Sequence, residues 1–235
     1  EADYKARVDR ILAAINLETP DRVPVRLNMG FWPAQSAGIT AAQAMNDPVA
    51  GAKAWKDFNF KFQPDASVDP IHNTTPAQMF KALDYKLYAW PGHGVSETAS
   101  YQYNEKEWMA PEDYDHLISD PSDYLLRTYL PRTVGAFAGF GNLSSLFDFI
   151  ELPFVSAHVG AWGTPEMAAG LKQLAEAAEA LGTWAEAVFP VMGEVKAAGF
   201  PPFASCGTKA PFDILGDTLR GTKGIIVDLF RRPEK

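Results

Sequence analysis

The sequence predicts an α/β fold in which strands alternate with long helices. Residues 23–27 form a short apolar run, and Phe58, Phe60 and Phe62 alternate with polar residues as in a strand with one buried face. A long helical stretch follows from residue 164. Strands separated by helices of this length are typical of a parallel sheet rather than of an antiparallel sandwich.

The expected sheet is incomplete. A closed eight-stranded barrel fits a chain of 235 residues, yet only three segments resemble inner barrel strands, the third being residues 200–206. We therefore expect the N-terminal part of a (β/α)8 barrel of the TIM type, with a helix-rich N-terminal region. Residues 1–235 would form a single, incomplete barrel domain, and a C-terminal segment or a second chain would supply the remainder.

Capping residues mark where the expected helices begin. Thr40 with Gln43 three residues later forms a capping-box pattern. Asp47 before Pro48 is a typical N-cap followed by a proline at the first helical position. In the long helix that starts at residue 164, Pro190 is expected to kink or split the helix. Further helices are expected to start at residues 75, 111, 120 and 211, and a last helix to span 225–232.

Composition argues against several classes of protein. Hydrophobic residues make up 47% of the chain, which excludes intrinsic disorder. The 21 Lys and Arg residues against 29 Asp and Glu give a net charge of −8, which argues against nucleic acid as a partner. The sequence has no apolar run near the roughly 20 residues that span a bilayer and no signal-peptide pattern at its start. The single cysteine, Cys206, is expected to be a small buried side chain and suits a cytoplasmic location.

Three phrases of the sequence are similar to those of one enzyme superfamily. They read RILAAINLETPDRVPV at residues 10–25, PGHGVSETASYQYNEKEWMAPEDYDHLISDP at 91–121 and PFDILGDTLRGTKGIIVDLFRRPE at 211–234. Together they resemble the uroporphyrinogen decarboxylase superfamily, and the phrase at 91–121 resembles its cobalamin-dependent methyltransferase-like branch. The resemblance implies a barrel whose site lies at the C-terminal ends of the strands.

The resemblance also implies a reaction. In this branch a methyl group moves between a small methylated compound or thiol and a cobalamin cofactor that a partner corrinoid protein carries. The methyltransferase relatives generally use zinc, held by the second half of the barrel, to keep a thiol as its thiolate. This chain has no His-x-Cys pair and no Cys-x-x-Cys motif. We therefore assign no metal ligand here and expect any zinc ligands to lie outside this chain.

Two alternatives stay open. The first is porphyrinogen decarboxylation, in which two arginines after the first strand bind substrate carboxylates. Met29 and Pro33 occupy those positions here, and the family's tyrosine falls at or beside Asp217. The aspartate that holds the pyrrole NH groups could map to Asp65. The second alternative is a non-catalytic half-barrel subunit that only associates with another chain.

The candidate site residues are polar or aromatic and follow the expected strands or lie in loops. Asp65 would lie at the site-bearing end of the barrel, or else act as a turn or cap residue. His93, between two glycines, could transfer a proton, or could lie exposed in a tight turn. Asp217 could be a site acid, or a helix residue paired with a lysine or arginine. The catalytic candidates are Asp65, His93 and Asp217, and the substrate-binding candidates are Asn28, Trp32 and Arg26.

Overall fold

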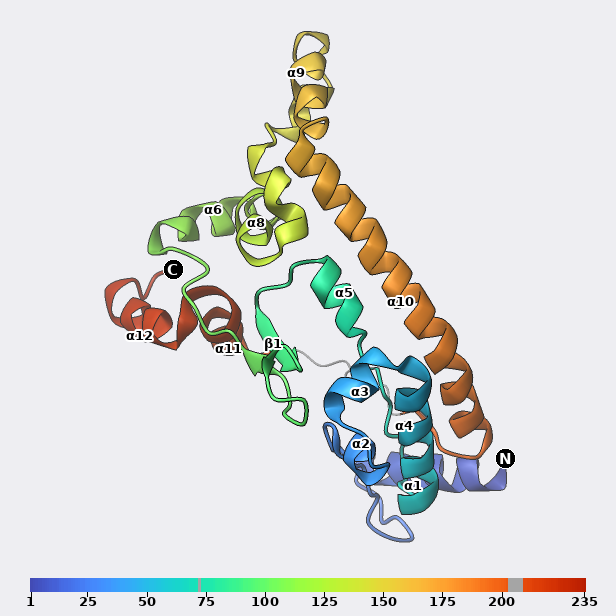
Figure 1. Ribbon diagram of the computed structural model, residues 1–235. Helices are drawn as coiled ribbons and strands as arrows, with labels where there is room; N and C mark the ends of the chain where they lie inside the picture. Colours follow the sequence, from blue (N-terminus) through green and yellow to red (C-terminus); the bar gives the residue numbers. More distant parts are fainter. Residues whose placement is uncertain (72, 203–208) are drawn as a thin grey trace. The chain divides into compact units, whose positions relative to one another are not determined.

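The computed structural model describes residues 1–71, 73–202 and 209–235 (Figure 1). The chain divides into two compact units, and each unit combines separate stretches of sequence. Unit 1 comprises Glu1–Gln78, Trp90–Tyr101 and Glu179–Gly207. Unit 2 comprises Met79–Ala89, Gln102–Ala178 and Thr208–Lys235.

The fold is dominated by helices, so the prediction of part of a (β/α)8 barrel is wrong. Of the described residues, 64% are helical and 5% lie in strands. The strands form one small sheet in the order β2-β1-β3. β1 (Tyr88–Pro91) pairs in parallel with β2 (Gly94–Val95) and antiparallel with β3 (Gln102–Tyr103), over two residue pairs each.

The alternating phenylalanines belong to helix α4 (Pro48–Phe62) rather than to a strand. Five residues of alternation fit either structure when the residues are aromatic, because a helix can bury both sides of such a segment. The rings of Phe58 and Phe62, four residues apart, lie 4.5 Å from each other. Phe60 packs on another side of the helix, with its ring 5.6 Å from that of Phe200. The helix that begins at Pro48 therefore continues through the predicted strand.

The other two expected barrel strands are also missing from the described residues. Residues 23–27 have no regular strand pairing. One backbone hydrogen bond reaches this segment, from the N–H of Asp65 to the carbonyl of Val25 at 2.8 Å. Residues 200–202 are irregular, and the rest of the predicted strand at 200–206, with Cys206, lies outside the described residues.

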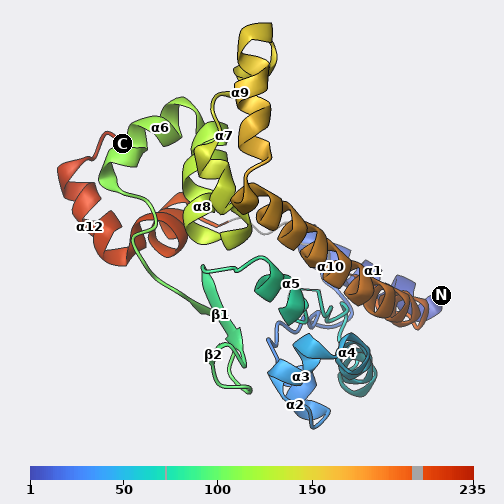
Figure 2. The ribbon, with the colours of Figure 1, turned by 45° about the horizontal axis from the view of Figure 1, so that its top comes forward.

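Unit 1 is built mainly from N-terminal helices, two of which begin where their capping residues predict. The capping box of Thr40 and Gln43 is confirmed, with hydrogen bonds of 2.8 and 3.0 Å. The Asp47 side chain accepts a hydrogen bond from the N–H of Ala50 at 2.9 Å, which confirms it as an N-cap. Figure 2 shows α2, α3 and α4 close together. The helices that precede α4 are α1 (Ala2–Ile15), α2 (Trp32–Ser36) and α3 (Ala41–Asn46).

The core of unit 1 joins α4 to the second part of the long helix α10 (Pro165–Ala197). Ala52, Trp184 and Val188 form one buried cluster, and the Trp184 indole donates a hydrogen bond to Thr74 Oγ1 at 3.2 Å. α10 runs through Pro190 without the predicted split. No helix in the described part of the chain is both long and apolar enough to cross a membrane.

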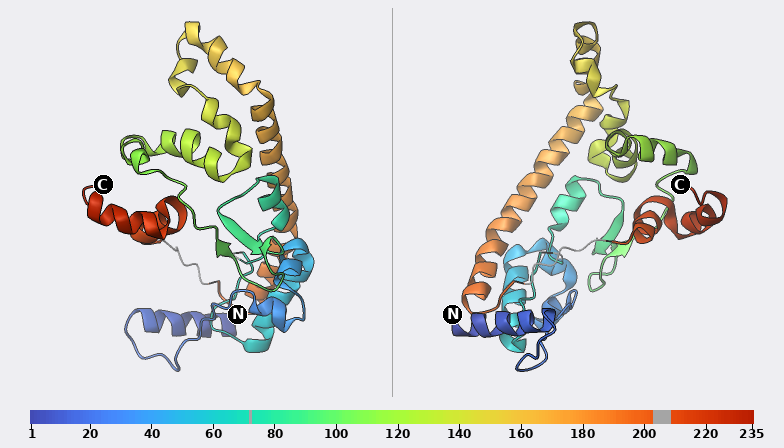
Figure 3. Two further views of the ribbon diagram at one scale, coloured as in Figure 1. Left: turned by 60° about the vertical axis from the view of Figure 1, so that its left-hand side comes forward. Right: turned by 180° about the vertical axis from the view of Figure 1, so that it is seen from behind.

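Unit 2 consists of short helices around an aromatic core. Met109, Tyr114, Tyr124, Tyr129 and Leu219 form its main buried cluster. Figure 3 shows that η4 and α9 lie side by side. The short helices are α5 (Ala77–Ala82), η1 (Pro111–Asp113), α6 (Tyr114–Ser119), α7 (Pro121–Tyr124), η2 (Leu125–Tyr129), α8 (Leu130–Thr133), η3 (Gly135–Asn142), η4 (Leu146–Phe149) and α9 (Leu152–Trp162).

The C-terminal part of unit 2 is a run of three helical segments. α11 (Pro211–Ile214) continues into the π-helical turn η5 (Leu215–Arg220), and α12 (Gly221–Arg231) follows at once. Gly221 has φ +72°, a conformation that favours glycine and lets the chain change direction between two helices. The predicted starts at residue 211 and near residue 225 therefore belong to a bent helical pair.

Candidate functional site

Asp65 lies at the centre of a buried ion-pair cluster in unit 1. Its side chain is 1% exposed. The carboxylate accepts two hydrogen bonds from the Arg22 guanidinium, at 2.6 and 2.7 Å, and one from Arg10 Nη1 at 2.6 Å. A fourth comes from the backbone N–H of Val25 at 2.7 Å. Because a carboxylate offers about four acceptor positions, this side chain is fully occupied.

These contacts also set the charge of Asp65. Burial by itself would raise the pKa of Asp65, but the hydrogen bonds from Val25, Arg22 and Arg10 outweigh burial and hold the pKa below the ordinary 3.8. The carboxylate is therefore ionised at neutral pH and neutralised by two guanidinium groups. We interpret Asp65 as a residue that joins α1 to the segment at Val25, not as a proton-transfer group.

His93 lies in a tight turn of unit 1, as one of its two interpretations predicts. Its backbone exchanges hydrogen bonds with Trp90 at 2.7 and 2.9 Å. Gly92 and Gly94 both have φ +78°, so the flanking glycines are needed for the turn itself. The exposed imidazole stacks on the buried Trp90 ring at 4.0 Å. No described contact joins His93 to Asp65.

Asp217 lies on η5 in unit 2 and forms an ion pair with Lys209. Lys209 Nζ also donates a hydrogen bond to the Tyr103 hydroxyl at 2.6 Å. Of the two interpretations of Asp217, the contact with Lys209 fits the second, a helix residue paired with a lysine or arginine. Asp217 belongs to a different unit from Asp65 and His93.

The substrate-binding candidates are distributed along one segment of unit 1. Trp32 is 40% exposed, and its ring lies 5.3 Å from Phe58 and 5.1 Å from Phe62, so much of it is committed to packing. Asn28 and Arg26 are both exposed. These residues do not line a described cavity.

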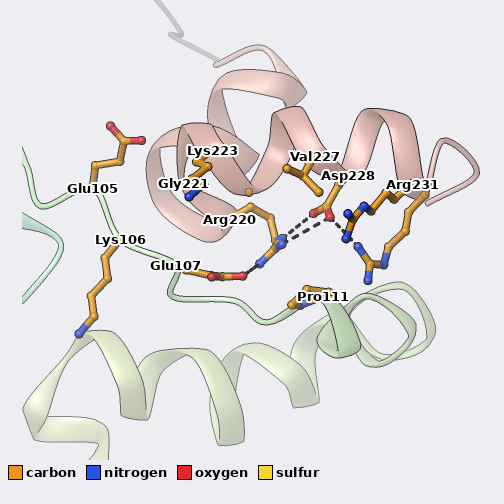
Figure 4. Close-up of a pocket in the computed structure, with 12 residues that line it drawn as sticks. Glu105, Lys106, Glu107, Pro111, Arg220, Gly221, Lys223, Val227, Asp228 and Arg231 are labelled. Carbon is orange, nitrogen blue, oxygen red and sulfur yellow. Dashed lines mark hydrogen bonds and ion pairs between the residues drawn. The ribbon is translucent and has the colours of Figure 1, made fainter.

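Unit 2 contains a cavity of about 500 Å³ (Figure 4). This volume falls within the range of roughly 300–1,000 Å³ that is usual for small-molecule sites. One wall is the segment from Glu105 to Pro111, and the other is formed by Arg220 and α12. The walls belong to the phrases at 91–121 and 211–234, which are far apart in the sequence.

A buried ion pair fixes the two walls of the cavity to each other. Arg220, 3% exposed, donates from Nε to Asp228 Oδ2 at 2.6 Å and from Nη1 to the Met109 carbonyl at 2.6 Å. It also forms an ion pair with Glu107. The Tyr114 hydroxyl donates to Asp228 Oδ2 at 3.0 Å. Arg220 therefore holds α12 against the segment that precedes η1.

The same contacts explain the charge of Asp228. Burial would raise the pKa of Asp228, but the hydrogen bonds from Arg220 and Tyr114 and the charge of Arg220 outweigh burial and keep the pKa below 3.8. Arg232 Nη1 adds a further hydrogen bond at 2.8 Å. Asp228 is thus an ionised, satisfied carboxylate inside the protein.

The cavity has more positive than negative charge among its described lining residues. Its acidic side chains are all engaged: Glu107 and Asp228 by Arg220, and Glu105 by the N–H of Thr222 at 2.7 Å. Lys223 and Arg231 also line it, and the described residues provide neither with an ion pair. Figure 4 shows that Lys106 points away from α12. Two uncommitted cations suit a small molecule with a negative charge.

The described residues do not fit a zinc site. Over residues 1–71, 73–202 and 209–235, no group of three or more His, Cys, Asp or Glu side chains could hold a metal ion. Zinc in proteins is generally held by three or four such ligands. No chemical step at the cavity is therefore assigned to a metal.

Comparison with known proteins finds no matching family model, no matching curated protein and no matching solved structure.

The sequence patterns did not identify Arg220 and Asp228. One signal was available, since Asp228 and Arg232 have the i, i+4 spacing of a helical ion pair. The pairing of Asp228 with Arg220 depends on the turn at Gly221, and the contact of Arg220 with Glu107 joins distant segments. Neither contact follows from local periodicity.

Proposed function

We propose that the chain acts as a corrinoid-linked methyltransferase whose small-molecule site is the cavity of unit 2. One observation carries the proposal: the phrase at 91–121, which resembles the methyltransferase-like branch, and the phrase at 211–234, which resembles the superfamily as a whole, together line this cavity. The substrate would be a small methylated compound or thiol with a negatively charged group. This proposal does not depend on a barrel.

The cavity residues would bind and orient the substrate. Lys223 and Arg231 would hold its anionic group, and the buried pair of Arg220 with Asp228 would keep α12 in the position that presents both cations. Fixing a substrate at its charged end restricts its freedom and leaves the methyl or sulfur end available, which is the positioning effect that methyl transfer needs.

The cobalamin would stay on a partner corrinoid protein, and when present it would donate or accept the methyl group. The cavity is lined largely by charged side chains, which suit a small ion better than the broad corrin ring. Any zinc would need ligands other than those of the described residues.

Decarboxylation is less well supported. A decarboxylase aspartate must offer its carboxylate to pyrrole NH groups, whereas the acceptor positions of Asp65 are filled by Arg10, Arg22 and Val25. The two arginines that would bind the substrate carboxylates are replaced by Met29 and Pro33. Both observations favour the methyltransferase proposal.

Methyl transfer tests the proposal directly. The 235-residue chain is incubated with methylcobalamin and a small carboxylate-bearing thiol, and the methylated thiol is measured by mass spectrometry. We expect product to form faster than in a control that contains heat-denatured protein. Equal rates would contradict the proposal, and conversion of uroporphyrinogen to coproporphyrinogen would favour the decarboxylase alternative.

A further inference from the structure

Unit 2 has an apolar surface made by η4 and α9. Its side chains are between 45% and 86% exposed. We call it the η4–α9 surface, and it consists of Leu146, Phe147, Phe149, Ile150, Leu152 and Val159.

The sequence around this surface lacks the charges that usually keep an exposed helix in water. Residues 152–165 contain no Asp, Glu, Lys or Arg, and the residues just before them provide only Asp148 and Glu151. A helix that is apolar on most sides is normally buried. Soluble monomers rarely expose continuous apolar patches beyond a few hundred Å². We therefore expect another molecule to cover the η4–α9 surface.

One side of α9 is already covered inside unit 2. His158 is 1% exposed, its ring lies 4.1 Å from that of Phe149, and its Nδ1 is 2.8 Å from Ser144 Oγ. The other side presents Leu152 and Val159, seven residues apart and thus on one face. They are 86% and 50% exposed. This outer face is available to another molecule.

We propose that the η4–α9 surface pairs with the same surface of a second copy of this chain. The inference concerns assembly and does not depend on methyl transfer. In a two-fold dimer the same patch meets itself, so an apolar patch satisfies both partners at once. A two-fold axis perpendicular to α9 would make the two α9 helices antiparallel.

The area of the surface agrees with a dimer. A buried aromatic side chain covers about 150–250 Å², and a Leu, Ile or Val side chain covers about 100 Å² by the usual transfer arithmetic. With the observed exposures, each copy offers on the order of 500 Å² of apolar area. Two copies would bury about 1,000 Å², which is typical of weak, transient interfaces. We therefore expect a dimer that dissociates readily on dilution.

The charges also agree with an antiparallel arrangement. Asp148 and Glu151 both precede α9, at the end where the helix dipole is positive. When two α9 helices are antiparallel, these acidic groups lie at opposite ends of the pair, separated by about 16 Å for an 11-residue helix. In a parallel pair these acidic groups would lie close together and repel each other.

Sedimentation equilibrium across a series of protein concentrations tests the proposal. We expect the mass to rise from one chain to two. The variant Val159→Glu, which places two like charges in the apolar interface, should raise the dissociation constant at least tenfold. The matched control Val49→Glu, at a position 68% exposed on α4, should leave it unchanged. A wild-type chain that stays monomeric, or equal effects of both variants, would overturn the proposal.

A cross-linking experiment tests the geometry without relying on a destabilising change. Ser156 is exposed near the middle of α9, where a two-fold axis would bring the two copies close. In a Cys206→Ser background, Ser156→Cys should form a disulfide-linked dimer on mild oxidation. Ser122→Cys, also exposed but on α7, should form little disulfide-linked dimer under the same conditions. Equal yields from the two variants would exclude this arrangement.

Discussion

Arg220 and Asp228 form an ion pair 2.6 Å long in which the two residues are 3% and 4% exposed, respectively. A buried charge that loses its partner is costly, because it remains in a medium that solvates it poorly. We expect Arg220→Met or Asp228→Leu alone to lower the free energy of unfolding by about 3–5 kcal/mol.

The double variant Arg220→Met/Asp228→Leu distinguishes pairing from simple packing. Replacing both charges with apolar groups removes the unpaired ion, so the double variant should lose less stability than the two single variants added together. Urea unfolding of all four proteins gives this coupling. Additive losses would show that Arg220 and Asp228 do not act as a pair.

Asp65 provides the corresponding test in unit 1. Asp65→Asn leaves Arg10 and Arg22 without their common carboxylate; because the Arg22 side chain is 49% exposed and stays solvated, we expect a loss of about 1–3 kcal/mol. The control is Asp21→Asn, because Asp21 also pairs with Arg10 but its side chain is 65% exposed. An exposed ion pair is screened by solvent and contributes little, so the Asp21 variant should lose less stability. Equal unfolding midpoints for the two variants would contradict the structural role of Asp65.

Acid should unfold the protein through its paired carboxylates. Burial by itself would raise the pKa of Asp65 and Asp228, but their hydrogen bonds outweigh burial and lower both pKa values. The hydrogen bonds from Arg127 likewise lower the pKa of Asp123. Each pKa is below the ordinary 3.8 in the folded chain. These groups therefore stabilise the fold at pH values above about 4, and this stabilisation is lost as the pH falls through the folded pKa values.

Urea midpoints measured at several pH values check this dependence. We expect these carboxylates to contribute little slope between about pH 5 and 8 and a steep loss of stability below about pH 4. Asp228→Asn should reduce the steepness of the acid limb. A urea midpoint that rises as the pH falls below about 4 would contradict the stabilising role of these carboxylates.

Two glycines of α10, Gly170 in unit 2 and Gly182 in unit 1, provide a test of helix packing and its control. A Cβ on Gly170 would lie 2.2 Å from the carbonyl oxygen of Ala136 in η3, whereas a Cβ on Gly182 would meet nothing within 4 Å. We expect Gly170→Ala to destabilise the protein by about 1–3 kcal/mol. Gly182→Ala should stabilise it by about 0.5–1 kcal/mol, because alanine restricts the unfolded chain more. Thermal unfolding measures both changes. If the unfolding temperatures of the two variants shifted in the same direction, this packing would be contradicted.

Local chemistry explains which parts of the fold were predictable. Thr40 and Gln43 contact each other across one helical turn, and Asp47 caps the helix that follows it directly. Such side-chain to backbone bonds depend on three or four residues, so the sequence contains all the information they require.

The strand predictions failed because short apolar patterns are ambiguous. Phe58, Phe60 and Phe62 match the period of a strand, but a helix that starts at Pro48 continues through them and packs the rings on more than one side. The site was harder to predict, since Arg220 meets Asp228 only across the turn at Gly221 and meets Glu107 only after distant segments come together. The pairing of Asp217 with a cation was predictable as one of two interpretations, and its partner in the structure is Lys209.

The most direct test of the account is the methyl-transfer rate of variants at the cavity. Lys223→Glu and Arg231→Glu reverse the two uncommitted cations, and Lys81→Glu makes the same change in charge at an exposed position on α5. We expect the rate with the carboxylate-bearing thiol to fall at least tenfold in the two cavity variants and to be unchanged in Lys81→Glu. Rates that are equal in all of these proteins would contradict the assignment of the cavity as the substrate site.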